Sequence, residues 1–176
     1  MSDVFDDPAI QWMMSDIGIK PSKDTKEFMD RVAAIESSGN PKATSKVSSA
    51  RGKYQWLNGD KPDGTKGLNV FQEDIAAAKR YYQKSKNDVP KWLKDAEKHN
   101  DPRKLSESEQ DKLFLFRMYR LGKNSDLARA YSGDRNTQRM LYMQLHHTAP
   151  DDATRERVDL FLPAEAKPGM LTGGYP

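Results

Sequence analysis

Glu36 is the residue whose setting is best suited to chemistry. It lies at the end of a predicted helix, residues 24–37, in which Phe28, Val32 and Ile35 share one face, and a turn of small residues follows it. A carboxyl that is partly buried at the negative end of a helix dipole favours its protonated form. A general acid needs that form to protonate a leaving oxygen. The alternative is an ordinary solvated glutamate at a helix end.

Three strings in the chain carry a family resemblance. The first is Glu36-Ser37-Ser38-Gly39-Asn40-Pro41-Lys42-Ala43-Thr44-Ser45, the second is Gly52-Lys53-Tyr54-Gln55, and the third is Ala130-Tyr131-Ser132-Gly133. In order and distance they resemble the Glu-Ser, Asn-Pro-x-Ala-x-Ser, Gly-x-x-Gln and Ala-Tyr-Asn-x-Gly elements of the lysozyme-like lytic transglycosylases. The chain departs from that pattern at Tyr54, where methionine is usual, and at Ser132, which replaces asparagine and is followed by glycine one place early.

The resemblance implies a role for each matching residue. Glu36 would be the catalytic acid, Ser45, Tyr54 and Gln55 would line a sugar-binding cleft, and Tyr131 would hold the carboxyl of Glu36 by a hydrogen bond. The residue types alone also allow plainer roles: a loop cap for Ser45, a polar strand contact for Gln55 and ordinary packing for Tyr131.

The mechanism implied by the family uses one carboxyl twice, as acid toward the glycosidic oxygen and then as base toward the C6 hydroxyl of the same muramic acid residue. The product is a 1,6-anhydro sugar and no water is consumed. A hydrolase would instead place a second carboxylate across the scissile bond. Asp60 and Asp63 are the candidates for that role, although the Asn-Gly-Asp and Pro-Asp-Gly contexts favour turns.

Helical periodicity and capping residues predict a mainly α fold. Residues 40–68 are rich in Gly, Ser, Asn, Asp and Pro, and one apolar stretch at 54–57 predicts a strand or tight hairpin. The expected architecture is therefore a lysozyme-like helical domain with a small β-hairpin or loop region after the catalytic helix. The other predicted helices cover residues 70–82, 90–96, 106–121, 125–131, 135–146 and 151–162.

Composition limits the size of the core and the chemistry. Leu, Ile, Val and Phe together make up 30 of the 176 residues, so the core must draw heavily on alanine, methionine and aromatic side chains. The absence of cysteine excludes a disulfide scaffold, a thiolate zinc site and a cysteine nucleophile. We expect an N-terminal arm or short helix over residues 1–20, a catalytic domain over 21–162 and a flexible tail over 163–176.

Other features suggest binding but carry less weight. Residues 79–104 contain nine Lys or Arg and four Asp or Glu, a pattern also seen in nucleic-acid-binding proteins. Helical spacing places much of this charge on a solvent face, so we expect no nucleic acid partner but an attraction to the anionic cell wall. The adjacent His146 and His147 point apart on a helix and cannot chelate one metal ion as an i, i+4 pair can. No metal or organic cofactor is expected.

Together these features predict an enzyme that cleaves the MurNAc-GlcNAc β-1,4 bond of peptidoglycan. The acidic start of the chain does not resemble a secretory signal. The chain also contains no run of 18 apolar residues, the length that would predict a membrane-spanning helix. We therefore expect a bacteriophage product, either carried in the virion with other virion proteins or released to the wall as an endolysin. The alternatives are a hydrolytic muramidase of the same fold, a non-catalytic phage structural or tail protein, and a basic nucleic-acid-binding protein.

Overall fold

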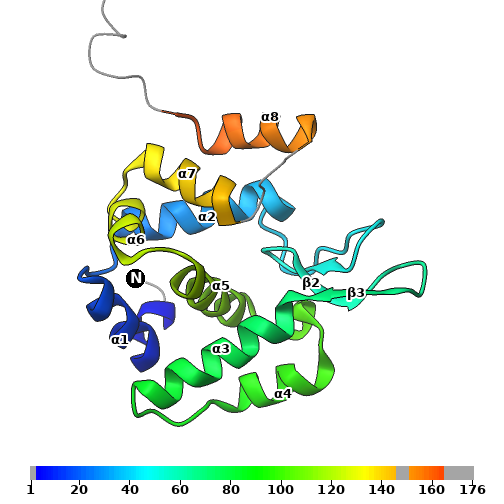
Figure 1. Cartoon of the computed structure of the whole chain (residues 1–176), viewed down its shortest axis with the longest axis horizontal. Coiled ribbons are helices and arrows are strands. Elements are labelled where there is room, and N and C mark those ends of the chain that lie inside the picture. The colour runs from blue at the N-terminus through cyan, green and yellow to red at the C-terminus, as the bar shows by residue number, and fades with distance from the viewer. Residues whose placement is uncertain (1–2, 146–150, 165–176) are drawn as a thin grey trace, which may run out of the picture.

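The computed structural model describes residues 3–145 and 151–164 of the chain, and it confirms a mainly helical fold with a small antiparallel sheet (Figure 1). In chain order, the elements of this part are η1 (Asp3–Asp6), α1 (Pro8–Ile17), α2 (Lys23–Ser37), β1 (Ala50–Arg51), β2 (Trp56–Asp60), β3 (Lys66–Asn69), α3 (Val70–Lys84), α4 (Lys91–His99), η2 (Pro102–Lys104), α5 (Glu107–Leu121), α6 (Asn124–Tyr131), α7 (Arg135–Leu145) and α8 (Asp152–Phe161). The predicted helices are all present, with ends that differ by a few residues. His146, His147 and most of the predicted tail lie outside the described residues.

Helix α2 carries Glu36 in its last turn. It begins one residue earlier than predicted, because Ser22 and Thr25 form the capping box: the Ser22 hydroxyl accepts from the backbone, and Thr25 Oγ1 accepts from the Ser22 amide at 3.0 Å. The C-cap of the helix is Ser38, whose left-handed φ of 56° directs the chain into the following loop. Glu36 is thereby fixed two residues before a sharp change of chain direction.

Helix α5 runs through the middle of the molecule (Figure 1). Its residues Leu113–Phe116 are all fully buried, so four consecutive side chains point in different directions and each finds a packing partner. The helix begins with a capping box: Ser106 Oγ accepts from the Glu109 backbone amide, and Glu109 Oε1 accepts from the Ser106 backbone amide. Helices α1, α3 and α6 pack around α5 and make it the centre of the core.

Residues 3–20 contain a short helix, α1, which is one of the two alternatives expected for this segment, and they pack into the core. Asp7 caps α1 by accepting from the backbone amides of Ala9 and Ile10 at 2.9 and 3.2 Å. Ile10 and Met13 are fully buried, and the Tyr82 hydroxyl of α3 donates to the Asp7 carboxylate. Because the apolar side chains of this segment repeat at helical spacing, they supply one wall of the same hydrophobic core.

The sheet has the order β1-β2-β3, and both pairings are antiparallel. Ala50 pairs with Leu57 and Arg51 with Trp56, while Asn58 pairs with Asn69 across an irregular register. The predicted strand at 54–57 therefore starts two residues late, because Gln55 adopts a left-handed φ of 55° in the turn before β2. The β2–β3 hairpin projects from one side of the helical body (Figure 1).

The composition of the core agrees with the expectation of small and aromatic residues. Buried members of these types include Ala9, Ala33, Ala77, Ala78, Ala96, Ala130, Phe28, Phe71, Phe114, Phe116, Tyr54, Tyr81, Tyr82, Tyr131, Tyr142 and Trp56. Alanine lets neighbouring helices approach closely, and the aromatic rings then fill the remaining space. Across the described ranges, no helix combines the length and the apolar character needed to cross a membrane.

Candidate active site

A cavity of about 460 Å³ lies where the end of α2, the β-sheet, α5 and α8 meet. In Figure 1, α2 and α8 lie on one side of this region and β2 and β3 on the other. The described residues that line the cavity are Glu36, Ser45, Ser48, Ala50, Tyr54, Gln55, Trp56, Leu57, Val70, Arg117, Asp151 and Arg157. Four of the five predicted site residues are in this set, and Tyr131 is not.

The carboxyl of Glu36 is held by a phenol from α7. The Tyr142 hydroxyl donates to Glu36 Oε1 at 2.6 Å, across 106 positions of the sequence. Burial raises the pKa of Tyr142 far above the ordinary value for a tyrosine, and the charge of Glu36 and the hydrogen bond to it add to this effect. The phenol consequently keeps its proton and acts only as a donor toward Glu36.

The predicted partner of Glu36, Tyr131, has a different place in the structure. Its side chain is fully buried, and within the described residues its hydroxyl has no hydrogen-bond partner. Its backbone oxygen accepts from Thr25 Oγ1 at 2.9 Å, near the start of α2. Thr25 and Glu36 are 11 positions apart, which corresponds to about 16 Å along a helix at 1.5 Å per residue. The prediction for Tyr131 is therefore wrong: it packs at the other end of α2.

The sequence contains only a weak indication that Tyr142 faces the interior of the protein. It lies four residues after Gln138, and both side chains are buried on the same face of α7. The Gln138 amide nitrogen donates to the Ala130 backbone oxygen at 2.8 Å, which anchors α7 against α6. The i, i+4 spacing shows that the two residues share a face, but only the packing of α7 on α2 shows that the phenol reaches Glu36.

Ser45 and Gln55 both line the cavity, and both are held by their own loops. Ser45 Oγ accepts from the Val47 and Ser48 backbone amides at 3.2 and 3.1 Å, which is the loop-cap role that the residue type alone suggested. Gln55 Nε2 donates to the Gly52 backbone oxygen at 2.9 Å. Both residues are half-buried, so they combine a fixed position with access to the cavity.

Tyr54 contributes its ring to the cavity wall but directs its hydroxyl into the core. The ring stacks on Phe114 with centroids 4.3 Å apart, and the hydroxyl donates to Asp111 Oδ1 at 2.6 Å. Burial, and then the charge of Asp111, raise the pKa of Tyr54 well above its usual value. Lys53 Nζ lies 2.9 Å from the same carboxylate and compensates its charge. Tyr54 therefore fixes the wall and offers no hydroxyl to a ligand.

A buried ionic cluster behind the cavity was not found by sequence reasoning. Asp74 on α3 is fully buried, and it accepts from Trp56 Nε1 at 2.9 Å and from Arg117 and Arg120 at 3.1 and 2.6 Å. Trp56 and Arg117 in turn line the cavity. The signal in the sequence was an acidic residue between Phe71 and Ile75 on an apolar face, a position where a charge needs a partner.

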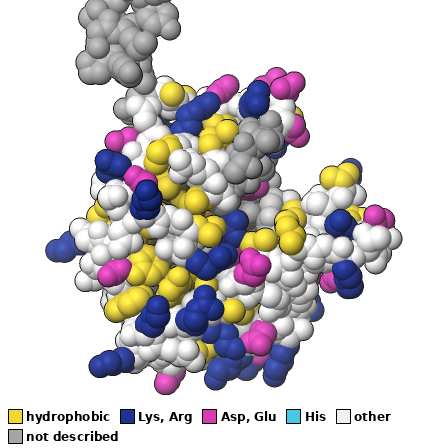
Figure 2. Space-filling view, viewed as in Figure 1, with side chains coloured by type: hydrophobic (Ala, Val, Ile, Leu, Met, Phe, Trp, Pro, Cys, Tyr) yellow, Lys and Arg dark blue, Asp and Glu magenta, His cyan; other side chains and the backbone are white. Residues whose placement is uncertain are grey.

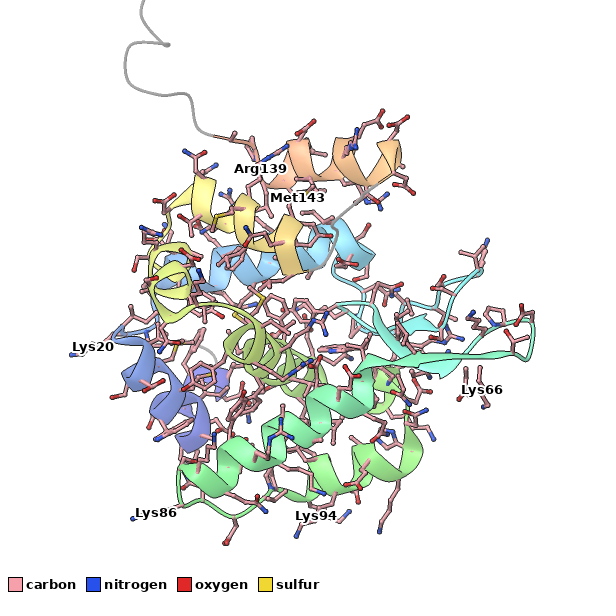
Figure 3. All side chains as sticks on the ribbon, viewed as in Figure 1. Lys20, Lys66, Lys86, Lys94, Arg139 and Met143 are labelled. Atoms are coloured by element: carbon pink, nitrogen blue, oxygen red, sulfur yellow. The ribbon has the colours of Figure 1, made fainter. Side chains whose placement is uncertain are left out.

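The second carboxylates considered for hydrolysis lie outside the cavity lining. Asp60 pairs with Lys66 across the β2–β3 hairpin, and Figure 3 shows Lys66 on that projecting hairpin. Asp63 accepts from the Thr65 hydroxyl and amide, and these bonds lower the pKa of Asp63. Asp63 lies in the turn that its context favoured, whereas Asp60 is the last residue of β2. The carboxylate that joins Glu36 in the lining is Asp151, which caps α8 by accepting from the Thr154 amide at 2.7 Å.

The basic segment 79–104 occupies the outer side of α3 and α4. Lys and Arg side chains gather on the face that includes α3 and α5 in Figure 2. Lys86 and Lys94 point outward at the end of the molecule opposite α8 (Figure 3). Lys79 pairs with Glu97 at 2.5 Å, so part of the local charge is compensated between α3 and α4. The exposed lysines form the solvent face that the helical spacing predicted.

Comparison with known proteins adds no identification: no family description, no curated protein and no solved structure matches the chain. Within residues 3–145 and 151–164, no three His, Cys, Asp or Glu side chains come together as metal ligands. The fold and site define a mainly α domain in which one carboxyl, held by a phenol, faces a cavity lined by polar loop residues and arginines.

Proposed function

We propose that this protein is a peptidoglycan lytic transglycosylase that cleaves the β-1,4 bond between MurNAc and GlcNAc. The observation that carries the proposal is the joint position of three residues. Glu36, Ser45 and Gln55, which the family resemblance marks as acid and cleft residues, line one cavity together. The cavity volume of about 460 Å³ falls in the range of small-ligand sites and suits part of a glycan strand.

In the first step, Glu36 is the general acid. Its Oε1 atom accepts the Tyr142 hydrogen bond, so the reacting proton is carried on Oε2. That proton passes to the glycosidic oxygen while the bond between this oxygen and C1 of MurNAc breaks. The GlcNAc part leaves with a 4-hydroxyl group, and positive charge develops at the MurNAc C1.

In the second step, the Glu36 carboxylate is the general base. It removes the proton from the C6 hydroxyl of the same MurNAc, and the oxygen attacks C1 to form the 1,6-anhydro ring. The Tyr142 phenol stabilises the carboxylate between the two steps, since it remains a donor. The acid is restored at the end, and one carboxyl has served both steps without water.

Hydrolysis is the second candidate, because Asp151 lines the same cavity as Glu36. A hydrolase requires a second carboxylate across the scissile bond as base or nucleophile. Asp151 already uses Oδ1 to cap α8, which favours a structural role for it. We therefore keep transglycosylation as the proposal, and the chemical structure of the released product distinguishes it from hydrolysis.

The test uses purified sacculi, the full chain and a Glu36→Gln variant. We expect the native protein to release soluble fragments, and the variant to release them about 10²- to 10⁴-fold more slowly, which is the usual contribution of a general acid-base group. Mass spectrometry of the fragments shows anhydro ends, lighter than reducing ends by one water. Reducing ends alone would replace transglycosylation with hydrolysis.

The native protein and the Glu36→Gln variant also distinguish a catalytic role from a non-catalytic one. The Glu36→Gln side chain keeps its size, so the Tm should change little, and equal release by both proteins would remove Glu36 as the catalyst. No release by the native protein over a range of pH would favour a structural protein of this fold. The setting in a bacteriophage, with virion proteins as partners, stays a prediction from the sequence.

A further inference from the structure

Helix α8 is a fixed wall of the cavity. Val158 and Leu162 are buried, and α8 packs on α2. Arg139 of α7 holds the far end of α8, since it lies 2.8 Å from the Asp159 carboxylate and donates to the Leu162 backbone oxygen at 3.1 Å. Figure 3 shows Arg139 on α7 beside α8. A side chain on the inner side of α8 therefore has a defined position relative to Glu36.

Arg157 is the cation that α8 places at the cavity. Its Nε donates to the Ile35 backbone oxygen at 3.0 Å, and its Nη2 donates to Thr154 Oγ1 at 3.3 Å. Ile35 is the residue immediately before Glu36 in the chain. Both acceptors are neutral oxygens, so they orient the guanidinium without cancelling its charge.

Arg117, on the opposite wall of the cavity, differs from Arg157 in the charge of its partner. It also lines the cavity, but it is bound to the buried carboxylate of Asp74, 3.1 Å away. A salt bridge of this kind uses the charge of the arginine for the fold. Arg157 is exposed, and its two hydrogen-bond partners among the described residues are neutral, so its charge acts on whatever occupies the cavity.

We propose that Arg157 binds a carboxylate carried on the lactyl side chain of the muramic acid residue. This inference rests on the proposed function. In that substrate, alternate sugars bear a lactyl group, which ends in its own carboxylate or in a peptide with carboxylates, whereas GlcNAc bears none. A guanidinium held by two neutral acceptors keeps further N–H groups for a planar carboxylate. Arg157 is then a specificity-determining residue that sets which sugar lies beside Glu36.

The test measures binding in a Glu36→Gln background, so that ligands are not cleaved. Three probes are titrated by calorimetry: a neutral GlcNAc oligomer, a peptide-free GlcNAc-MurNAc oligomer with a lactyl carboxylate, and the same oligomer carrying stem peptides. We expect Arg157→Gln to weaken binding of one or both carboxylate ligands about tenfold and to leave the neutral oligomer unchanged. The peptide-free ligand separates the lactyl carboxylate from those of the peptide.

Arg155→Gln is the matched control, because Arg155 is an exposed arginine on the same helix and is not part of the cavity lining. It should bind all three probes like the parent. With Glu36 present, Arg157→Gln should raise the KM for sacculi about tenfold and leave kcat within about twofold, and Arg157→Lys should recover part of the loss.

The outcomes that overturn the assignment are distinct from failure of the proposed function. Equal weakening of the neutral and the charged ligands would show that Arg157 only supports the end of α2. Unchanged binding of all three probes would show that it does not meet the ligand. Absence of binding of every probe to the parent would refute the proposed function together with this assignment.

Discussion

The hydrogen bond between Tyr142 and Glu36 supports the sharpest prediction, which uses a Tyr142→Phe variant. The substitution removes one hydroxyl group and keeps the ring, and the ring is fully buried. The lost bond is 2.6 Å long and ends on the carboxyl proposed to do the chemistry. The change therefore removes the restraint on Glu36 with little effect on the packing of α7.

The magnitude follows from the type of bond. A hydrogen bond to a charged acceptor contributes about 1.5–3 kcal/mol, and the lower end applies because Glu36 is only half-buried. A loss of about 1.5–2 kcal/mol lowers the Tm of a chain of this size by about 3–8 °C. The bond stabilises the carboxylate more than the neutral acid, by about 1 kcal/mol. Its loss should move the pH profile of cleavage about 0.7 units to higher pH and lower kcat about tenfold through poorer orientation.

The assay is release of soluble fragments from sacculi at a series of pH values, together with thermal unfolding. Tyr131→Phe is the matched control, because its buried hydroxyl has no hydrogen-bond partner within the described residues. That variant should keep its activity and lose no stability, since it removes a polar atom that burial leaves unsatisfied. Full activity and an unchanged pH profile in Tyr142→Phe, or equal losses in both variants, would refute the reasoning.

Three further predictions concern the support of the site. Asp74→Asn should lower the free energy of unfolding by about 2–3 kcal/mol, seen as a lower midpoint in urea, because two arginines lose their carboxylate; an unchanged midpoint would contradict the importance of this cluster. Asp60→Asn and Asp63→Asn should each leave the release of fragments within about twofold, and a loss of 10²-fold or more in either would restore a second catalytic carboxylate. Burial lowers the pKa of Lys53, but its bonds to Glu107 and the charges around it outweigh burial and raise that pKa above about 10.5. Its stabilising contribution is complete below the unfolded pKa and is lost as pH rises through the folded value. Lys53→Gln should therefore differ most from the native protein at neutral pH and least at strongly alkaline pH in denaturant unfolding.

The helices were predictable because their signals are local. The Ser106–Glu109 capping box and the apolar repeat after it define α5, and both depend only on residues within a few positions of each other. The predicted start of α2 is one residue late for an equally local reason: the capping box is formed by Ser22 and Thr25, and Ser22 lies before the predicted helix. The sequence could not show that α1 joins the core, because an amphipathic helix has the same pattern whichever surface it covers.

The candidate site was predictable only in part. The position of Glu36 at a helix end and the loop positions of Ser45 and Gln55 follow from short-range patterns, and the structure brings these three residues to one cavity. The phenol that holds Glu36 was not predictable from spacing. Tyr131 and Tyr142 are 11 positions apart on successive helices, and the turn between α6 and α7 decides which of them faces the end of α2.

The amino-acid sequence by itself determined the mainly helical class, the position of the central carboxyl and the small, aromatic character of the core, since each depends on composition or on periods of a few residues. The tertiary structure alone decided that Tyr142 bonds Glu36, that Asp74 holds two arginines behind the cavity, and that α8 brings Arg157 beside Ile35. The physical reason is distance along the chain: these contacts join residues 43 to 122 positions apart, and only the packing of whole helices brings such residues together.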